Sequence, residues 1–204
     1  VHFIAPSLSK FDRYTKKVQL FDLPFLVNDD EGLKRLLDGE VGSEVLATLD
    51  ANNLKGMAMW GAGFRHMTNN IRPITGPDDL RGIKMRTLQA PAILATYRAY
   101  GANPTAMAYT EVYNGLQQGV VEGQENPFAN IYSMKFHEVQ KYLTLTAHAY
   151  HTYAAVMHKP TWDGLPEDLQ QVVLDALIVG RDAAREFTAE DDARILEEIG
   201  DQIE

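Results

Sequence analysis

The chain of 204 residues contains no cysteine, which excludes thiol catalysis, cysteine-ligated zinc and disulfide bonds. It has no apolar run of about 18 residues, so the sequence predicts no transmembrane helix. Lysine and arginine never gather in a block, and the formal net charge is −9. An acidic chain without a basic patch is not typical of proteins that bind nucleic acid or an anionic membrane surface.

What is present is the composition of an ordinary folded protein, with 45% hydrophobic and 23% charged residues. Between residues 83 and 136, short apolar segments alternate with helical patterns. One of these helices, at 90–101, has Pro91 in its first turn and Gly101 after its end. This alternation predicts an α/β fold built on a mainly parallel sheet, with helices on both faces.

The first part of the chain favours one strand and two helices. Residues 1–6 are typical of a strand that starts at Val1 with no turn before it. We therefore expect that sequence is missing at the N-terminus. Leucines at helical spacing predict a helix over 31–39, stopped by glycine, and a second helix over 43–53 with Ser43 as its N-cap.

Further strands are predicted at 55–63, where glycines end the apolar run, and at 141–146 and 153–158. From Pro166 onward, apolar residues recur at helical spacing. They predict one amphipathic helix of about 20 residues, which the acidic segment 188–192 breaks or restarts.

Enzyme motifs are absent from the sequence: there is no G-x-S-x-G elbow, no P-loop and no H-E-x-x-H. His148 and His151 could share a metal only on a helix, and the local pattern is that of a strand, so we interpret them as histidines at a strand end. An α/β enzyme acting on a carboxylic acid stays open as an alternative, with His66 or His151 as general base. No set of nucleophile, base and orienting group supports it.

Two polar residues follow predicted strands, at the edge where α/β sheets bind ligands. Arg86 offers a planar fork of donors that suits a carboxylate, although an ion pair with Asp or Glu is the commoner fate of such a residue. Asn126 can supply a donor and an acceptor together. It can equally be the N-cap of the helix that begins at Pro127, and both roles can coexist.

Long, ordered motifs run through the chain: GIKMR followed by QAPA, then GANPTAMAYTEVYNGLQQGVVEGQENP, then KFHEVQKYLTLTAH. LPFL, WGAGFR, PDDLRG and LPEDLQQVV fit the same pattern. In these motifs the sequence resembles the DctP-type solute-binding proteins of tripartite ATP-independent periplasmic (TRAP) transporters, over roughly residues 1–195.

This resemblance implies two α/β lobes with a ligand cleft between them and a long helix spanning both. It places 1–62 and 152–188 in lobe I, and 63–151 and 189–204 in lobe II. It implies a periplasmic protein without a cofactor or catalytic activity, which captures a small organic acid and delivers it to a TRAP permease. A ligand-sensing domain on the same scaffold is an alternative. Family members are longer, so we expect the fold to be incomplete at both ends.

The resemblance also implies a binding site. Arg86 would hold the ligand carboxylate, Asn126 would assist it, and Arg65 would lie nearby. Gln89 and Tyr109 match two further pocket positions. Weaker candidates from pocket-facing segments are Trp60, Phe128, Tyr150 and His151.

The identity of the acid is left open: simple C4-dicarboxylates, sugar acids, keto acids and aromatic acids all fit. An early strand that sometimes carries an acidic contact in the family offers only Pro6 and Ser7 here. A ligand with a distal amine or many hydroxyls therefore has no acidic partner from that strand.

Overall fold

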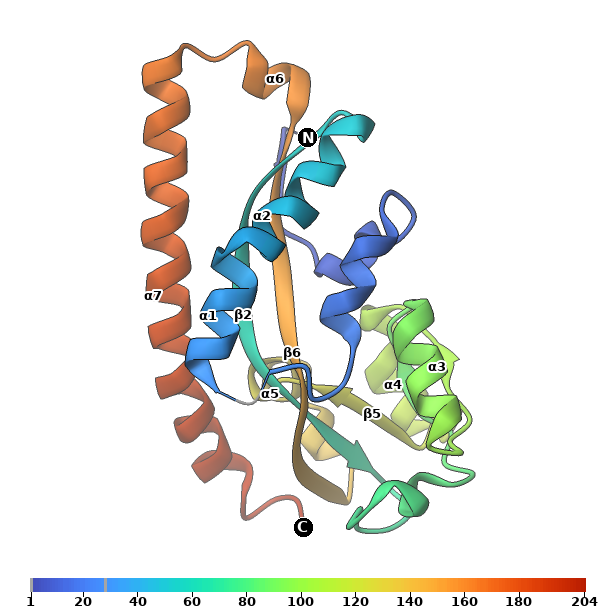
Figure 1. Cartoon of the computed structure of the whole chain (residues 1–204). Coiled ribbons are helices and arrows are strands. Elements are labelled where there is room, and N and C mark those ends of the chain that lie inside the picture. The colour runs from blue at the N-terminus through green and yellow to red at the C-terminus, as the bar shows by residue number, and fades with distance from the viewer. Residues whose placement is uncertain (1, 28) are drawn as a thin grey trace.

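Two long strands form the spine of the molecule (Figure 1). The computed structural model describes residues 2–27 and 29–204, so the prediction made for Val1 lies outside the described residues. Strand β2 (Leu54–Asn69) pairs antiparallel with β6 (Tyr142–His158) from one end to the other. Both strands run through the upper and the lower half of the molecule, so the two halves share them.

The main sheet is antiparallel, with the strand order β1-β6-β2-β5. Its outer strands are β1 (Phe3–Ile4) and β5 (Gly123–Asn126). The predicted mainly parallel sheet is wrong, because parallel pairing within the described residues is limited to β3 (Arg86–Thr87) with β4 (Thr105–Ala106) and one bridge between Met85 and Gly123. The strand–helix alternation is real, but its strands are two to four residues long, and β2 with β6 supplies most of the sheet.

Both long strands bend where the sequence predicted that they end. The register of β2 against β6 shifts between Gly61 and Phe64, and Gly63 has a φ of 98°. In β6, Ala147 has a φ of 43°. These irregularities bend a strand and increase its twist without ending it. Hence the strand predicted at 55–63 continues to Asn69, and the two predicted at 141–146 and 153–158 are one.

The upper half packs helices on both faces of β2 and β6. Met59 and Ala154 belong to the core formed with α1 (Asp30–Asp38) and α2 (Glu40–Ala47). Their neighbours Ala58 and Ala155 contact α7 on the opposite face, as the two-residue period of a strand requires. Helix α1 ends at Gly39 as predicted. The N-cap predicted at Ser43 is wrong, because α2 begins directly after Gly39.

The lower half holds the short helices α3 (Pro91–Ala99), α4 (Val112–Gln117) and α5 (Phe128–Ser133). Helix α3 has the proline start that the sequence predicts. Short 3-10 helices connect many elements: η1 (Leu8–Phe11), η2 (Lys16–Asp22), η3 (Thr48–Asn52), η4 (Pro77–Leu80), η5 (Tyr109–Glu111) and η6 (Phe136–Glu138). Two separate hydrophobic cores fill this half, one around α3 and one around α4 and α5.

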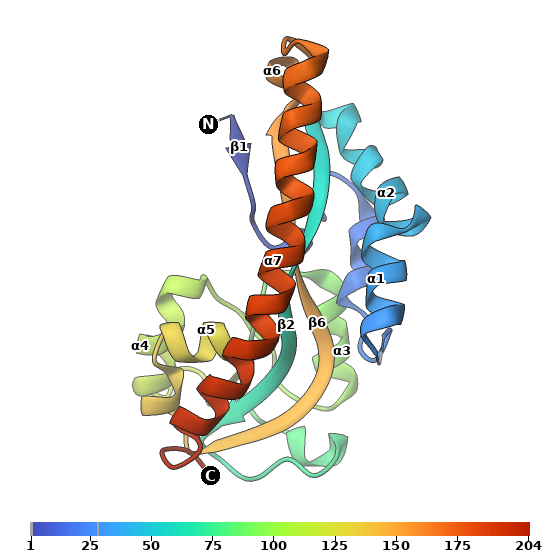
Figure 2. The same ribbon diagram turned by 90° about the vertical axis from the view of Figure 1, so that its left-hand side faces the viewer.

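Helix α7 (Glu167–Ile199) follows the short α6 (Lys159–Asp163) and runs along the whole molecule (Figure 2). Its Leu177 packs on the upper sheet, and its Ile195 lies in the lower core. The predicted spanning helix is confirmed, but the break predicted at 188–192 is wrong. The helix continues for 33 residues through its acidic stretch, where Asp191 pairs with Arg194 and burial raises the pKa of Asp192 to about 6. Among the described helices, none is both long enough and apolar enough to cross a membrane.

Candidate ligand-binding site

A cleft of about 880 Å³ opens between two walls that come from distant parts of the chain. One wall is η1 and the residues after it, including Lys10 and Arg13. The other wall is formed by β3, the start of α3, β4 and η5, and it carries Arg86, Gln89 and Tyr109. The structure thus brings three of the nine predicted site residues together at one cavity. In Figure 1, the dark blue 3-10 helices lie beside the green part of the chain, which contains the second wall.

Arg86 is almost fully buried, with 1% of its surface exposed. Its Nε and Nη2 donate to the carbonyl oxygen of Met107, at 3.1 and 2.8 Å. Its Nη1 is buried without a hydrogen-bond partner among the described residues. Burial lowers the pKa of the guanidinium, but arginine stays protonated in proteins. The structure therefore presents a buried cation at the cleft with unused donor capacity and no carboxylate partner.

Local sequence explains this placement. Arg86 is the first residue of the short strand β3, and Pro91 begins α3 a few residues later. The strand therefore ends shortly after Arg86, and the chain changes direction into the helix. Tyr109 is fixed in the same wall, because its hydroxyl donates to the carbonyl oxygen of Asn130 at 3.1 Å. Gln89 is exposed at the rim. Of the three residues, only Arg86 is both charged and buried.

Arg65 is placed differently. Its Nε and Nη2 donate to the two carboxylate oxygens of Glu125, the second at 2.5 Å, and its Nη1 donates to Nδ1 of His151. Arg65 and Glu125 are both buried. They lie together because β2 pairs with β5, where Met67 is opposite Glu125. The guanidinium predicted near the ligand therefore lies in a complete buried ion pair, outside the lining of the large cleft.

The buried histidines belong to the same polar network. His148 contacts the hydroxyl of Tyr97 at 3.2 Å through Nε2, and burial lowers its pKa to about 4. Burial, followed by the charges of Arg65, Arg86 and Lys10, holds the pKa of His151 well below its usual value. These histidines are therefore neutral at pH 7.

Neither histidine proposed as a general base lies on the large cleft. His66 stacks on Phe128, with ring centroids 4.3 Å apart, and burial lowers its pKa to about 4. His151 faces a cavity of only about 20 Å³, shared with Arg65 and Tyr150, which has room for little more than one water molecule. This geometry gives neither histidine access to a substrate. Within 2–27 and 29–204, no cluster of three or more potential metal ligands is found.

Asn126 is buried at the end of β5. Its Nδ2 donates to Oε1 of Gln124 at 2.6 Å, and its Oδ1 accepts from Nδ2 of Asn130 at 3.0 Å. The alternative role as N-cap of α5 is wrong, since Pro127 occupies that position and no side chain caps the helix. Phe128 is buried in the lower core.

The remaining two candidates lie on the upper sheet. Trp60 packs against α7, and its Nε1 donates to the carbonyl oxygen of Leu177 at 3.3 Å. Tyr150 meets Phe64 edge to face, with ring centroids 5.1 Å apart. Neither residue lines the large cleft.

Sequence reasoning missed the first wall of the cleft. Lys10, Asp12 and Arg13 line it, yet they lie in a polar segment without strand or helix periodicity. Asp12 is already engaged, since its carboxylate accepts from Lys16 at 2.9 Å and also from Gln19. The sequence signal that could have indicated this wall is its charge, since Lys10 and Arg13 flank a single acidic residue, Asp12.

Residues 1–203 match the model of the family described as bacterial extracellular solute-binding protein, family 7 (DctP). The chain belongs to this family. It is 39% identical over 202 residues to the C4-dicarboxylate-binding periplasmic protein DctP of Rhodobacter capsulatus, covering 98% of this chain and 60% of that protein. It is 38% identical over 180 residues to the 2,3-diketo-L-gulonate-binding periplasmic protein YiaO of Escherichia coli strain K12, covering 88% of this chain and 55% of that protein.

Solved structures of family 7 proteins have the same fold. A TRAP periplasmic solute-binding protein from Polaromonas sp. JS666, bound to D-erythronate, matches with a TM-score of 0.95 and 34% identity, covering 100% of this chain and 67% of that one. One from Sulfurospirillum deleyianum, with bound succinate, matches with a TM-score of 0.92 and 40% identity, covering 98% and 65%. The family and the two-lobed α/β fold implied by the sequence are thereby confirmed. The chain spans about 60% of the length of its Rhodobacter relative.

Proposed function

We propose that this chain is the ligand-capturing part of an extracytoplasmic solute-binding protein, and that Arg86 anchors the carboxylate of a small organic acid. The observation that carries the proposal is the buried Nη1 of Arg86, which has no partner among the described residues and lies at the cleft. A buried donor without a partner is costly, and a ligand carboxylate would satisfy it. The charged hydrogen bonds formed there contribute about 1.5–3 kcal/mol each.

The two walls of the cleft belong to different lobes in the proposed division, with 1–62 and 152–188 in lobe I and 63–151 and 189–204 in lobe II. The hydrophobic cores support this division, because two lie in the upper half, one on each face of the sheet, and two others fill the lower half. A ligand that touches both walls would favour a closed state over an open one. The bends at Gly63 and Ala147 lie where β2 and β6 pass between the lobes, and they are the proposed hinge.

The role is binding rather than catalysis, followed by delivery of the acid to a TRAP permease in the membrane. The family description and the ligand-bound relatives support this role. Asn126 would assist through the hydrogen-bonded amide pair that it forms beside the cleft, and Gln89 and Tyr109 would contact the carbon skeleton. Arg65, His151 and Phe128 would support this wall from behind, whereas Trp60 and Tyr150 belong to the upper half.

The test is a screen of organic acids by thermal shift and calorimetry. With ligand at 100 times its Kd, binding stabilises the folded state by about 2.7 kcal/mol and raises Tm. Arg86→Ala should abolish this shift, and Arg86→Lys should weaken it because the fork of donors is lost. Unchanged affinity in Arg86→Ala would remove the anchor role.

The matched control is Arg98→Ala, since Arg98 is exposed on α3 in the same half of the molecule. It should bind ligand as the unmodified protein does. Circular dichroism and the ligand-free Tm of each variant separate loss of binding from loss of folding.

A further inference from the structure

The cleft carries more positive charge than one anchor requires. Lys10 and Arg13 line the wall that faces Arg86. Among the residues in 2–27 and 29–204, the side chain of Lys10 has no hydrogen bond or ion pair, and that of Arg13 has only the ring face of Tyr14, 4.6 Å from its Cζ. Several other exposed cations are paired with an acidic residue three or four positions away, but in the described part of the chain these two are not.

The single carboxylate on the cleft and two of its hydroxyl groups are already engaged. The carboxylate of Asp12 accepts from Lys16 and Gln19. The hydroxyl of Ser9 donates to Asp22 at 2.5 Å, and that of Tyr109 donates to a main-chain carbonyl. The charged groups left for a ligand are therefore all donors, and a ligand amine would find no free carboxylate.

The charges of both walls reach the same interior point. Lys10 and Arg86 each contribute to the lowered pKa of His151, after burial and Arg65. His151 lies behind the cleft, in the small cavity that it shares with Arg65. A ligand between the walls would meet Lys10 on one wall and Arg86 on the other.

We infer that Lys10 is a second anchor, which binds another acidic group of the ligand and makes this protein selective for small diacids over monocarboxylic sugar acids. The inference rests on the proposed function of Arg86 and deepens it. Relatives with bound ligand include one with a diacid, succinate, and one with a monocarboxylate, D-erythronate, so family membership alone does not decide between them. The two anchors lie on different lobes of the proposed division, and bridging them gives the closed state its extra affinity.

The experiment compares succinate with D-erythronate by calorimetry at pH 7.5 on the purified protein and on Lys10→Gln. We expect the unmodified protein to bind succinate at least tenfold more tightly. In Lys10→Gln, succinate affinity should fall about 10- to 100-fold, the loss of one charge-assisted hydrogen bond. The affinity for D-erythronate should change by less than about threefold, because its single carboxylate is held by Arg86.

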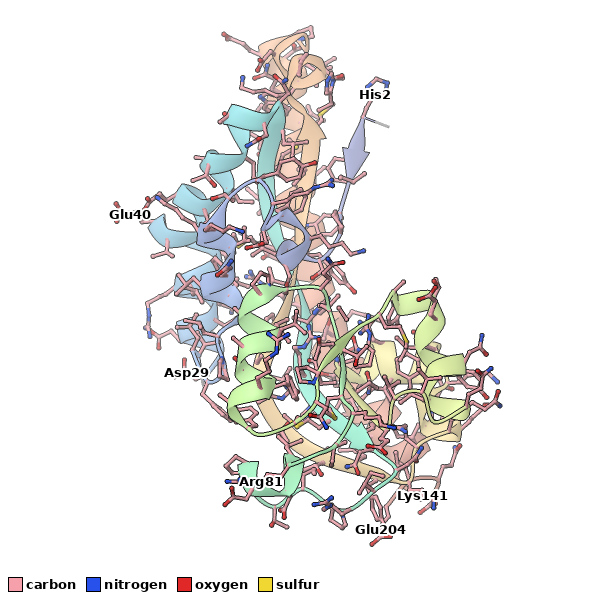
Figure 3. All side chains as sticks on the ribbon, turned by 90° about the vertical axis from the view of Figure 1, so that its right-hand side faces the viewer. His2, Asp29, Glu40, Arg81, Lys141 and Glu204 are labelled. Carbon is pink, nitrogen blue, oxygen red and sulfur yellow. The ribbon has the colours of Figure 1, made fainter. Side chains whose placement is uncertain are left out.

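Lys141→Gln is the matched control, since Lys141 is exposed at the far lower end of the molecule (Figure 3) and has no side-chain ion pair. It removes the same charge and should leave both affinities unchanged. Tighter binding of D-erythronate than succinate by the unmodified protein would overturn the inference. The inference would also be overturned if Lys10→Gln weakened the binding of both ligands equally, or left both affinities unchanged.

Failure of the second anchor is distinguishable from failure of the first. If Arg86→Ala binds neither ligand while Lys10→Gln binds both with unchanged affinity, the proposed organic-acid binding is supported and the proposed diacid selectivity is contradicted. If the unmodified protein binds neither acid nor any other carboxylate, both proposals fall together.

Discussion

Arg65 and Arg86 are both buried arginines, with 3% and 1% of their surface exposed, yet their surroundings differ. Arg65 has a carboxylate, a main-chain carbonyl and an imidazole for its donors. Arg86 has one carbonyl oxygen, shared by two of its nitrogens, and a third nitrogen without a partner. The guanidinium of Arg65 therefore has partners for its donors, whereas that of Arg86 has a donor without a partner among the described residues.

The difference shows which buried charge serves stability and which is available for a ligand. A buried ion pair is held because removing one partner leaves the other uncompensated. A buried cation that faces a cavity without an acid attracts an anion instead. We therefore expect substitutions at the two positions to change different measured quantities.

The largest expected effect is on stability, at Arg65. Arg65→Ala leaves the carboxylate of Glu125 buried without its main partner, and should lower the free energy of unfolding by about 3–5 kcal/mol. Arg86→Ala leaves no carboxylate stranded and should lower it by about 1–3 kcal/mol. Urea unfolding of the two variants measures the difference.

The double variant Arg65→Met with Glu125→Gln provides the control, since removing both charges avoids the stranded carboxylate. It should recover part of the stability lost in Arg65→Ala. Equal losses in Arg65→Ala and Arg86→Ala would contradict the distinction between the two arginines.

The short elements of the fold could be predicted from sequence because their signals are local. Gly39 ends α1, and Pro91 begins α3, as expected. The long elements could not be predicted from such signals. From the sequence, the glycines at the end of the segment 55–63 were expected to end the strand. In the structure they only bend β2, because β6 pairs with β2 on both sides of Gly63. The acidic stretch that was expected to break α7 continues the helix, with Asp191 paired to Arg194.

The candidate site divides in the same manner. Arg86, Gln89 and Tyr109 lie in one wall formed by sequence-near elements, and the motifs grouped them. The partner of Arg65 could not be predicted, because the pairing of β2 with β5 brings Glu125 to it from a distant part of the chain. Lys10 was missed for a related reason: its role depends on a cleft formed by two separate segments.

The second prediction uses pH to separate the two regions. Asp22 lies beside Arg65, and burial raises its pKa to about 6. A carboxyl with a raised folded pKa favours folding below its unfolded pKa, near 4, and this contribution is lost as the pH rises to about 6. Asp22→Asn, which stays neutral, should therefore raise the free energy of unfolding at pH 7.5 by as much as about 3 kcal/mol.

The gain should shrink as the pH falls and vanish near pH 4, where Asp22 is itself protonated. His66 and His148, whose pKa values are lowered to about 4, make both proteins less stable between pH 6.5 and 4, and this effect cancels in the difference. Urea unfolding between pH 4 and 8 measures it. Ligand affinity at pH 7.5 should be the same in both proteins, and a large change would mean that Asp22 is coupled to the Arg86 site.

The smallest expected effect is at Asn126, which lies between the two regions. Its amide bonds to Gln124 and Asn130, and each neutral hydrogen bond contributes about 0.5–1.5 kcal/mol. Asn126→Ala should lower the free energy of unfolding by about 1 kcal/mol and weaken ligand binding by up to about tenfold, measured by urea unfolding and calorimetry. Asn130→Ala removes one of the same bonds from outside the predicted site. If it weakens binding as much as Asn126→Ala does, Asn126 acts by holding the wall in place rather than by touching the ligand.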